Sequence, residues 1–395
     1  MNPVAITGFG VLSPNGTSAE AFWESLVDGV DRRGVWPKRP LDRYPVNNVI
    51  AIPEETWRMV MDDGAGSRAA AMAAFIVGQA QASAGVHPEP GRRIGCILAS
   101  TTVGAESVEA ALEANAATDT ALQARRVDSG FIPDAGFSWS GPAIGLSTAC
   151  SSGLVAPALA AEMLDAGEAN IMIAGGMDIL LEYTICGFNS LRLATREPCR
   201  PFSQDRKGVV LSEAGACFVL EPLASARARH APLHAVILGY GISCDAGHPT
   251  APGAEGIARA MQDALTMSRV VPGQIGGIVA HGTGTPVNDG VEVEALRLVF
   301  GTTPLPPMMS LKGAIGHSQA GAGASALLAV VLSLKHGVLP GTAGLQGIDP
   351  LLGSIRVASD VRPIEQRCLM VNAFGFGGNN CVLIVADESF AARQP

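Results

Sequence analysis

Short apolar runs alternate with Ala-rich stretches along most of the chain, and this alternation restricts the fold more than any other feature. The apolar runs have the length and composition of strands, and they are Val4–Thr7, Ile94–Ala99, Ile171–Ala174, Cys217–Leu220, Val236–Leu238, Gly277–Ala280, Leu369–Asn372 and Cys381–Val385. The Ala-rich stretches predict helices at Ala19–Val27, Arg68–Ala84, Ser152–Ala166, Glu255–Met267, Val291–Val299 and Gly323–Lys335. Several predicted strands are continuously apolar, as in a sheet buried between helices. The sequence therefore predicts an α/β fold.

Length and composition exclude several classes of protein. The 395 residues allow one large or two medium domains, and the apolar runs are too short to span a membrane. The N-terminus lacks a basic region followed by an apolar stretch, so we expect no signal peptide. A net charge of −9 argues against non-specific nucleic-acid binding. The eight cysteines include no CxxC pair, which argues against a disulfide framework or a zinc site and favours the cytoplasm.

One cysteine stands at the start of a predicted helix. Residues 147–153 read Ser-Thr-Ala-Cys-Ser-Ser-Gly and lead into Ser152–Ala166. The free N–H groups and the positive end of the helix dipole are expected to lower the pKa of the Cys150 thiol. The same N–H groups could hold an oxyanion. The sequence therefore indicates a nucleophile, and the alternative is a buried structural cysteine.

Two histidines and a lysine lie in Gly-rich segments. His281 follows the strand Gly277–Ala280 in the motif His-Gly-Thr-Gly-Thr, where we expect it to face a cleft. Lys312 and His317 share the loop Leu-Lys-Gly-Ala-Ile-Gly-His. Lysine is uncommon in this chain, which favours a role for the compact charge of Lys312. A lone histidine is more often a core or surface residue, but two in such loops indicate a catalytic site.

A second Gly-rich segment lies near the C-terminus. Residues 372–379 read Asn-Ala-Phe-Gly-Phe-Gly-Gly-Asn. Such a turn can bring backbone N–H groups against a ligand, and Phe374 or Phe376 could act as an apolar gate. The alternative is a plain connection between two strands.

Together, these motifs resemble the β-ketoacyl-acyl-carrier-protein synthases of the thiolase superfamily. The resemblance also includes the opening segment from Thr7 to Trp23 and a middle segment from Pro201 to Gly215. It implies a thiolase-like fold, with two similar halves in a five-layered α-β-α-β-α arrangement. We expect residues 1–240 to carry the nucleophile and residues 241–395 to carry the two histidines and the lysine.

The resemblance also implies a reaction. Cys150 would take an acyl group from the phosphopantetheine of an acyl carrier protein. Malonyl-carrier protein would then lose CO₂, and its carbanion would attack the acyl thioester. His281 and His317 would polarise the malonyl thioester carbonyl, and Lys312 would set the local field and hold the His317 loop. No cofactor and no metal are expected.

The remaining site residues are implied in the same way. The backbone N–H groups of Cys150 and Phe376 would form the oxyanion hole. Thr283 and Thr285 would bind the pantetheine arm, and Phe376 would gate the acyl tunnel. The expected partners are acyl carrier protein and either a second copy of the chain or a related synthase subunit.

Three departures from the family pattern indicate a specialised pathway, such as polyketide or polyene synthesis. Ala326 stands where the family usually carries Glu. The segment from Phe131 to Pro142 looks about ten residues shorter than is usual in the family. Only Arg68 remains of an expected Arg-x-Asp-Arg motif.

Other functions fit the motifs less well. A chain-length factor, which is a non-elongating partner subunit, typically lacks the cysteine, and malonyl-carrier decarboxylases usually replace it. A thiolase would carry a second cysteine in the C-terminal Gly-rich segment, where this chain reads Phe-Gly-Phe-Gly-Gly. A non-enzymatic scaffold would have no need of the catalytic candidates Cys150, His281, Lys312 and His317.

Overall fold

The computed structural model describes residues 1–36, 38, 41–61, 67–102, 104–114 and 139–394. Ten strands form one mixed sheet in the order β11-β10-β14-β15-β9-β1-β8-β6-β4-β5. Their bounds are β1 Val4–Leu12, β4 Ile94–Ala99, β5 Ala143–Leu146, β6 Ile171–Asp178, β8 Ala214–Pro222, β9 Ala235–Cys244, β10 Gly277–Val279, β11 Met308–Met309, β14 Cys368–Gly375 and β15 Asn379–Ala386. All eight predicted strands are confirmed.

The sheet consists of two halves with the same pairing pattern. In the first half, β4 is parallel to β5 and β6, and β8 is antiparallel to β6 and β1. In the second half, β10 is parallel to β11 and β14, and β15 is antiparallel to β14 and β9. A short antiparallel contact between β1 and β9 joins the halves. Because β9 belongs to the second pattern, we propose that the boundary between the halves lies just before β9 and not at residue 240.

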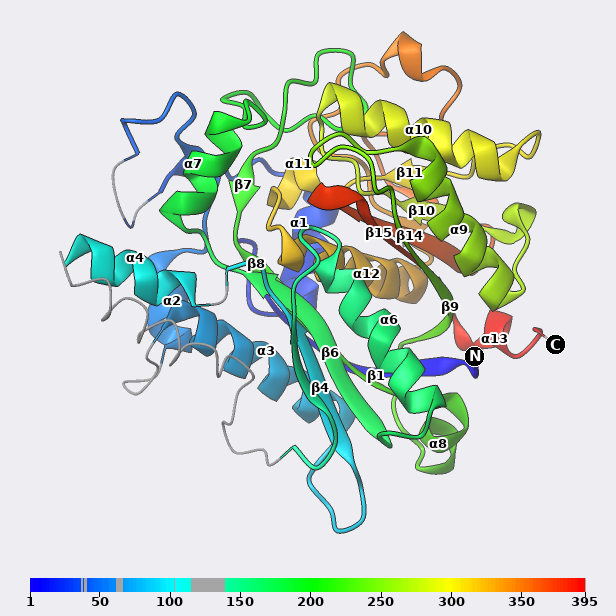
Figure 1. Cartoon of the computed structure of the whole chain (residues 1–395). Coiled ribbons are helices and arrows are strands. Elements are labelled where there is room, and N and C mark those ends of the chain that lie inside the picture. The colour runs from blue at the N-terminus through cyan, green and yellow to red at the C-terminus, as the bar shows by residue number, and fades with distance from the viewer. Residues whose placement is uncertain (37, 39–40, 62–66, 103, 115–138, 395) are drawn as a thin grey trace.

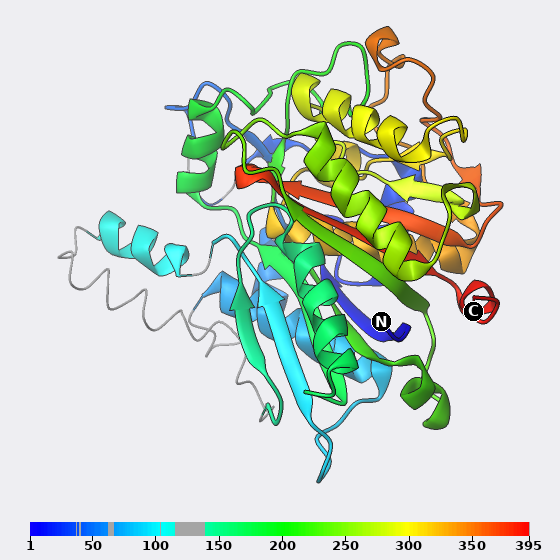
Figure 2. The same ribbon diagram turned by 45° about the vertical axis from the view of Figure 1, so that its right-hand side comes forward.

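Helices complete five layers, α-β-α-β-α (Figures 1 and 2). The central helices α6 and α12 pack against each other and against strands of both halves, whereas α3 covers the outer face of the first half and α9 with α10 covers that of the second. The six predicted helices are confirmed, and with their observed bounds they are α1 Ala19–Asp28, α3 Arg68–Ala84, α6 Ser152–Asp165, α9 Ala254–Ser268, α10 Pro286–Phe300 and α12 Ala320–His336. The predicted thiolase-like architecture is therefore confirmed.

The central helices approach each other closely at their N-terminal ends. A Cβ atom at Gly153 of α6 would lie 2.1 Å from the carbonyl oxygen of Ala320, the first residue of α12. Such a distance is far inside van der Waals contact, so only glycine fits there. Every residue of α12 from Ala320 to Leu334 is buried. This contact brings together the segments that precede the two helices, which carry Cys150 and His317.

Smaller elements lie around this frame. They are the strands β2 Gly34–Val35, β3 Asn48–Ile50, β7 Leu211–Ser212, β12 Val338–Leu339 and β13 Arg362–Pro363, the helices α2 Glu54–Val60, α4 Ala105–Glu113, α7 Glu182–Ser190, α8 Leu223–Ala228, α11 Lys312–Ile315 and α13 Glu388–Ala391, and the 3₁₀ turns Pro272–Gln274, Pro350–Leu352 and Phe376–Gly378. Within the described part of the chain, no helix is long and apolar enough to cross a membrane.

The three departures from the family pattern have different outcomes in the structure. Ala326 is buried within α12. Arg68 forms an ion pair with Glu54 and lies over the ring of Trp57. Residues 131–138, most of the shortened segment, lie outside the described residues.

Candidate active site

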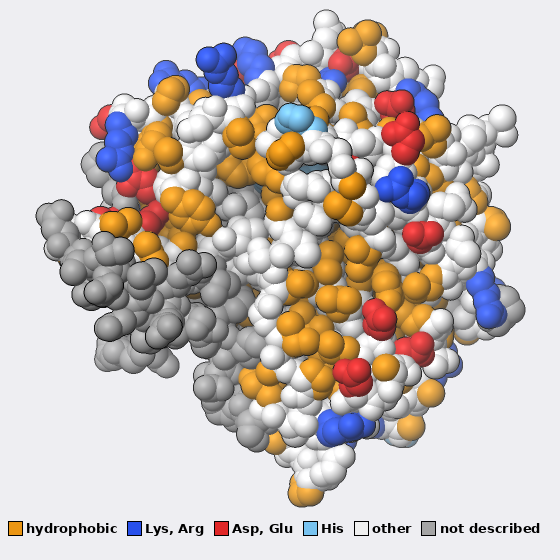
Figure 3. Space-filling view, viewed as in Figure 1, with side chains coloured by type: hydrophobic (Ala, Val, Ile, Leu, Met, Phe, Trp, Pro, Cys, Tyr) orange, Lys and Arg blue, Asp and Glu red, His pale blue; other side chains and the backbone are white. Residues whose placement is uncertain are grey.

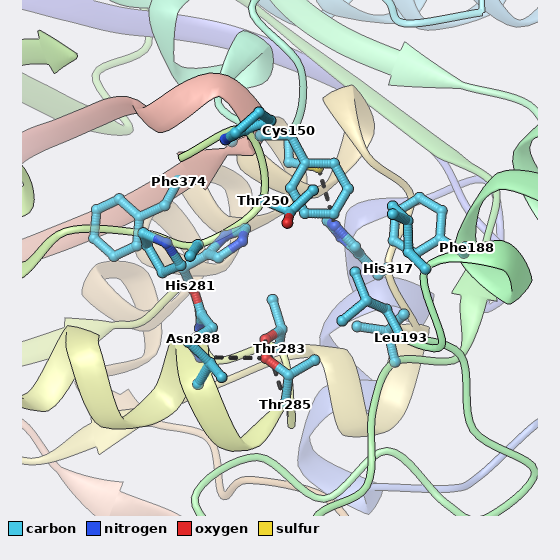
Figure 4. A pocket seen from close by; sticks show the side chains of 18 of the residues that line it. Cys150, Phe188, Leu193, Thr250, His281, Thr283, Thr285, Asn288, His317 and Phe374 are labelled. Atoms are coloured by element: carbon cyan, nitrogen blue, oxygen red, sulfur yellow. Dashed lines mark hydrogen bonds between the residues drawn. The ribbon is translucent and has the colours of Figure 1, made fainter. Parts of the chain in front are cut away.

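A pocket of about 300 Å³ opens at the ends of the two central helices (Figure 4). Of the residues singled out from the sequence, seven line it: Cys150, His281, Thr283, Thr285, His317, Phe374 and Phe376. Lys312 is buried behind them, with 2% of its surface exposed. The structure thus brings the whole predicted set together from both halves of the fold.

Cys150 occupies a sharp turn that precedes α6. Ala149 adopts a left-handed conformation with φ of 54°, which is uncommon for a residue with a side chain. Helix α6 begins two residues after the cysteine, at Ser152. The predicted turn into a helix N-terminus is therefore confirmed. The thiol reaches the pocket although only 6% of the residue is exposed.

The expected lowering of the thiol pKa is wrong. Burial raises the pKa of Cys150 to about 12, because a thiolate loses its hydration there. The charge of Lys312 and the backbone N–H groups of Phe376 and Cys150 act in the opposite direction, while Asp178 adds to the rise. The sequence showed the local N–H groups but not the depth of burial, and burial has the larger effect.

His317 is the immediate neighbour of the thiol. Its Nε2 lies 3.2 Å from Cys150 Sγ. The backbone of His317 is fixed on both sides, because its N–H donates to Val210 and its carbonyl accepts from Ser212. The segment before it is not a plain loop, since Lys312 to Ile315 form the short helix α11.

His281 stands directly beyond the end of β10, as predicted. Its ring lies 5.6 Å from that of His317 and nearly perpendicular to it. The N–H groups of His281 and Gly282 donate to the two carboxylate oxygens of Glu292, at 2.9 and 2.8 Å. Glu292 lies on α10 and is fully buried. The carboxylate therefore holds the turn that carries His281.

Lys312 fixes the protonation of His281. Its ammonium group donates to the carbonyl oxygen of His281 and lies 3.4 Å from the Nδ1 of the same residue. An ammonium has donors only, so Nδ1 accepts and the proton of a neutral His281 lies on Nε2. The family resemblance implied that Lys312 holds the His317 loop, but these bonds go to His281.

The environment favours the neutral form of both histidines. Burial lowers the pKa of each well below its ordinary value, and the charge of Lys312 lowers both further. Burial also lowers the pKa of Lys312 itself, while Glu292 counteracts that effect. A neutral imidazole with its proton on Nε2 can donate a hydrogen bond to a carbonyl oxygen without carrying charge.

Two threonines and the Gly-rich turn complete the pocket. Thr283 and Thr285 join their hydroxyl groups at 2.9 Å, and Thr285 caps the N-terminus of α10. Gly375 lies against the nucleophile turn, where a Cβ atom would be 3.1 Å from Cys150 N. This close approach brings the backbone of Phe376 to the thiol. The Phe376 ring packs 5.7 Å from the ring of Phe188.

Sequence reasoning missed three residues of the site. Glu292 faces inward on α10 with Asp289 one turn earlier, so the signal was two acidic residues at helical spacing on a buried face. Asp178 is a buried carboxylate at the end of β6. His248 lines the pocket mouth, and its Nδ1 accepts from Thr250 N at 3.2 Å. Among the described residues, no group of three His, Cys, Asp or Glu side chains is placed to hold a metal ion.

The fold is that of thiolase-like condensing enzymes, and its pocket brings one cysteine and two histidines together. The β-ketoacyl synthase N-terminal domain family matches residues 1–226, and the β-ketoacyl synthase C-terminal domain family matches residues 234–346. The chain therefore belongs to the β-ketoacyl synthase family, whose members are condensing enzymes.

Known relatives match over nearly the full length. The chain is 32% identical to nodulation protein E of Rhizobium leguminosarum bv. trifolii over 96% of this chain and 98% of the relative. It is 30% identical to 3-oxoacyl-acyl-carrier-protein synthase 2 of Coxiella burnetii, over 97% and 98%. Its structure matches the ishigamide ketosynthase/chain length factor with a TM-score of 0.87 and 29% identity, over 98% and 99%.

Proposed function

We propose that this chain elongates acyl groups on a carrier protein by decarboxylative condensation and that Cys150, His281, His317 and Lys312 carry the reaction. One observation supports this above all others. Cys150 Sγ lies 3.2 Å from His317 Nε2, in a pocket that also holds His281. A thiol and two imidazole rings thus face the same space.

In the first half-reaction, Cys150 Sγ attacks the carbonyl carbon of the acyl thioester. The pantetheine sulfur leaves and takes up the proton that the thiol releases. Negative charge develops on the carbonyl oxygen, and the N–H groups of Cys150 and Phe376, which lie near enough to the thiol to lower its pKa, would stabilise that charge. Because both N–H groups belong to the backbone, they need little reorganisation during the reaction.

In the second half-reaction, the malonyl thioester occupies the same pocket. His281 and His317 donate from Nε2 to its carbonyl oxygen, so that the charge released with CO₂ is held as an enolate. The enolate carbon then attacks the acyl carbon on Cys150 and releases the cysteine sulfur. Lys312 would keep both histidines neutral and would fix the tautomer of His281.

The carrier protein and the pantetheine arm are the proposed partners of the pocket mouth. Thr283 and Thr285 line the mouth with paired hydroxyl groups, which suit the amides of a pantetheine arm. We also propose that the chain works as a dimer in the cytoplasm. The second subunit would be another copy or a related synthase-like chain.

A non-elongating role is the second candidate, because one similar structure contains a ketosynthase together with a chain length factor. The presence of Cys150 in a formed site favours condensation over that role. The departures at Ala326 and Arg68 favour a specialised pathway over general fatty-acid synthesis.

Mass spectrometry of the purified protein with acyl-carrier and malonyl-carrier proteins tests the proposal. We expect an acyl adduct on Cys150 and release of a 3-oxoacyl-carrier product. Cys150→Ala should give neither, whereas the control Cys186→Ala, at an exposed thiol, should give both. Release of CO₂ without a condensed product would indicate a decarboxylase. No adduct and no CO₂ would indicate a partner subunit.

A further inference from the structure

The pocket has a buried end and an exposed end. Cys150, His281 and His317 lie at the buried end, with 6%, 4% and 2% of their surfaces exposed. His248 and Val287 line the same pocket but are exposed to solvent. A phosphopantetheine arm that brings its thioester to Cys150 passes these two residues. Its phosphate, which joins the arm to the carrier protein, then remains at the exposed end of the pocket.

The lining of the pocket offers an anion neither a strong cation nor a carboxylate. The described residues that line it include no Lys, Arg, Asp or Glu. The first turn of α10 also borders the pocket, at Pro286, Val287 and Asn288 (Figure 4). The positive end of that helix dipole adds a weak attraction for negative charge. A phosphate at the exposed end is therefore not repelled by the lining, but it needs a hydrogen-bond donor among neutral groups.

His248 has such a donor on one ring nitrogen. Its Nδ1 lies 3.2 Å from the backbone nitrogen of Thr250 and 3.2 Å from that of Ala251. Both backbone N–H groups donate to Nδ1, so this nitrogen is an acceptor and the proton of the neutral ring lies on Nε2. The hydrogen bonds that the described residues make with this ring all involve Nδ1. The N–H group at Nε2 is therefore available to a ligand.

The segment that carries His248 is fixed on both sides of the ring. After it, the carbonyl oxygen of Pro249 accepts from Gly377 N at 2.7 Å. Before it, the carboxylate of Asp245 accepts from Gly253 N at 2.8 Å and so closes the segment into a loop. Because the loop and the ring are held by these bonds, the Nε2 donor is in place before a ligand arrives. A donor placed in advance loses little freedom on binding, which favours affinity.

We propose that His248 binds the phosphate of the phosphopantetheine arm through its Nε2–H group and makes the pocket prefer a phosphorylated arm to pantetheine alone. This inference rests on the proposed condensing function, which brings the arm into the pocket. A hydrogen bond to a charged phosphate oxygen is roughly twice as strong as one between neutral groups. Pantetheine ends in a neutral hydroxyl at the same place, so it loses the charge-assisted part of the contact.

Binding of the two free arms tests the inference without the need for any reaction. The purified wild-type protein is titrated with phosphopantetheine and, separately, with pantetheine, and isothermal titration calorimetry gives the two dissociation constants. We expect Kd for phosphopantetheine to be about tenfold lower than Kd for pantetheine, as for one hydrogen bond to a charged group. The ratio of the two constants measures the contribution of the phosphate, because the rest of the arm is the same.

Two variants and one control separate the phosphate contact from support of the loop. His248→Asn keeps an acceptor for the N–H groups of Thr250 and Ala251, as Asn does in local turns, but it has no donor at the position of Nε2. It should bind both arms with the same affinity. His248→Gln places an NH₂ group near the position of Nε2 and should retain a preference for phosphopantetheine. The control is His87→Asn, at an exposed histidine outside the pocket lining, which should behave as wild type.

The outcomes distinguish this inference from the proposed function. If wild type binds both arms equally, or if His248→Asn keeps the preference for phosphopantetheine, His248 does not bind the phosphate and the inference is wrong. It is also wrong if His248→Asn weakens both arms by the same factor, because the residue then only supports the loop. Acyl transfer from the carrier protein to Cys150 is a separate measurement. Its failure in a protein that still prefers phosphopantetheine would reject the condensing function and leave the phosphate contact standing.

Discussion

Lys312 Nζ lies 3.4 Å from His281 Nδ1 and donates to the carbonyl oxygen of the same residue. One side chain therefore fixes both the backbone and the tautomer of His281, from a position 31 residues away in sequence. It also helps to keep His281 and His317 neutral. We expect the contact between Lys312 and His281 to control the pH range in which the second half-reaction proceeds.

Lys312→Met should slow CO₂ release from malonyl-carrier protein by on the order of 10²-fold, as for loss of an oriented donor. The pH profile should change in a defined direction. Because Lys312 lowers the pKa of both histidines, its removal raises them, and protonation then stops the reaction at a higher pH than in wild type. The acid limb of the rate profile should move to higher pH. Lys335→Met, at an exposed lysine, is the control. An unchanged acid limb in Lys312→Met would contradict this role.

The two histidines should matter more in the second half-reaction than in the first. Each donates to the malonyl thioester oxygen, where charge develops on loss of CO₂. His281→Ala and His317→Ala should each lower the rate of CO₂ release by about 10²–10³, with a smaller effect on acyl transfer to Cys150. Single-turnover assays of each step measure the difference. Wild-type CO₂ release in both variants would exclude this mechanism.

The free Cys150 thiol should react with iodoacetamide mainly at high pH. Because burial raises its pKa to about 12, the thiolate fraction increases about tenfold for each pH unit below that value. The alkylation rate of Cys150 should therefore still be rising at pH 9, as measured by mass spectrometry. The exposed thiols of Cys186 and Cys244 are replaced by serine so that they do not compete. A rate that levels off near pH 7 would show that the helix N-terminus lowers the pKa of the thiol by more than burial raises it.

Glu292→Gln should destabilise the turn that carries His281. The carboxylate accepts from His281 N on one oxygen and from Gly282 N on the other, whereas an amide has one acceptor oxygen only. One buried N–H therefore loses its partner, at a cost of about 1–3 kcal/mol in the free energy of unfolding. Urea denaturation measures it. The exposed neighbour Glu294→Gln is the matched control and should change stability by less than about 0.5 kcal/mol. Equal effects of the two substitutions would contradict this role of Glu292.

Much of this fold could be predicted because its strands and helices have strong local patterns. The strand at Ile94–Ala99 and the helix at Arg68–Ala84 match their predicted bounds. The catalytic candidates could also be found, since Cys150, His281 and His317 each lie in a segment of small residues beside a regular element. The residue types and their local order in the sequence were sufficient to predict these features.

Other features depend on contacts between distant segments, which a single sequence does not reveal. The inward orientation of Glu292 follows from how α10 packs. The pKa of the Cys150 thiol depends on the layers that surround it. In each case the residue type was visible, but its partners were not.

The outer edge of β5 should be the centre of a dimer interface. Among the described residues, no strand pairs with that edge, and apolar side chains gather over α6 on the face shown in Figure 3. An open edge and an apolar surface together favour a partner. The carbonyls of Pro142 and Leu146 accept from β4, at Cys96 N and Ser100 N. The backbone groups of Gly145, one residue before Leu146, therefore point to the free edge.

Gly145→Pro tests the interface without breaking the sheet. Proline removes one N–H from the free edge and leaves the pairing with β4 intact, as in natural edge strands. Light scattering after size-exclusion chromatography should show a dimer for wild type and a monomer for Gly145→Pro, with unchanged far-ultraviolet circular dichroism. The control is Gly145→Ala, which keeps the backbone N–H at the same position and should remain dimeric. A wild-type monomer that becomes a dimer only with a related synthase-like chain would establish a heterodimer, because the edge would then need a different partner strand. A Gly145→Pro variant that stays dimeric would place the interface elsewhere.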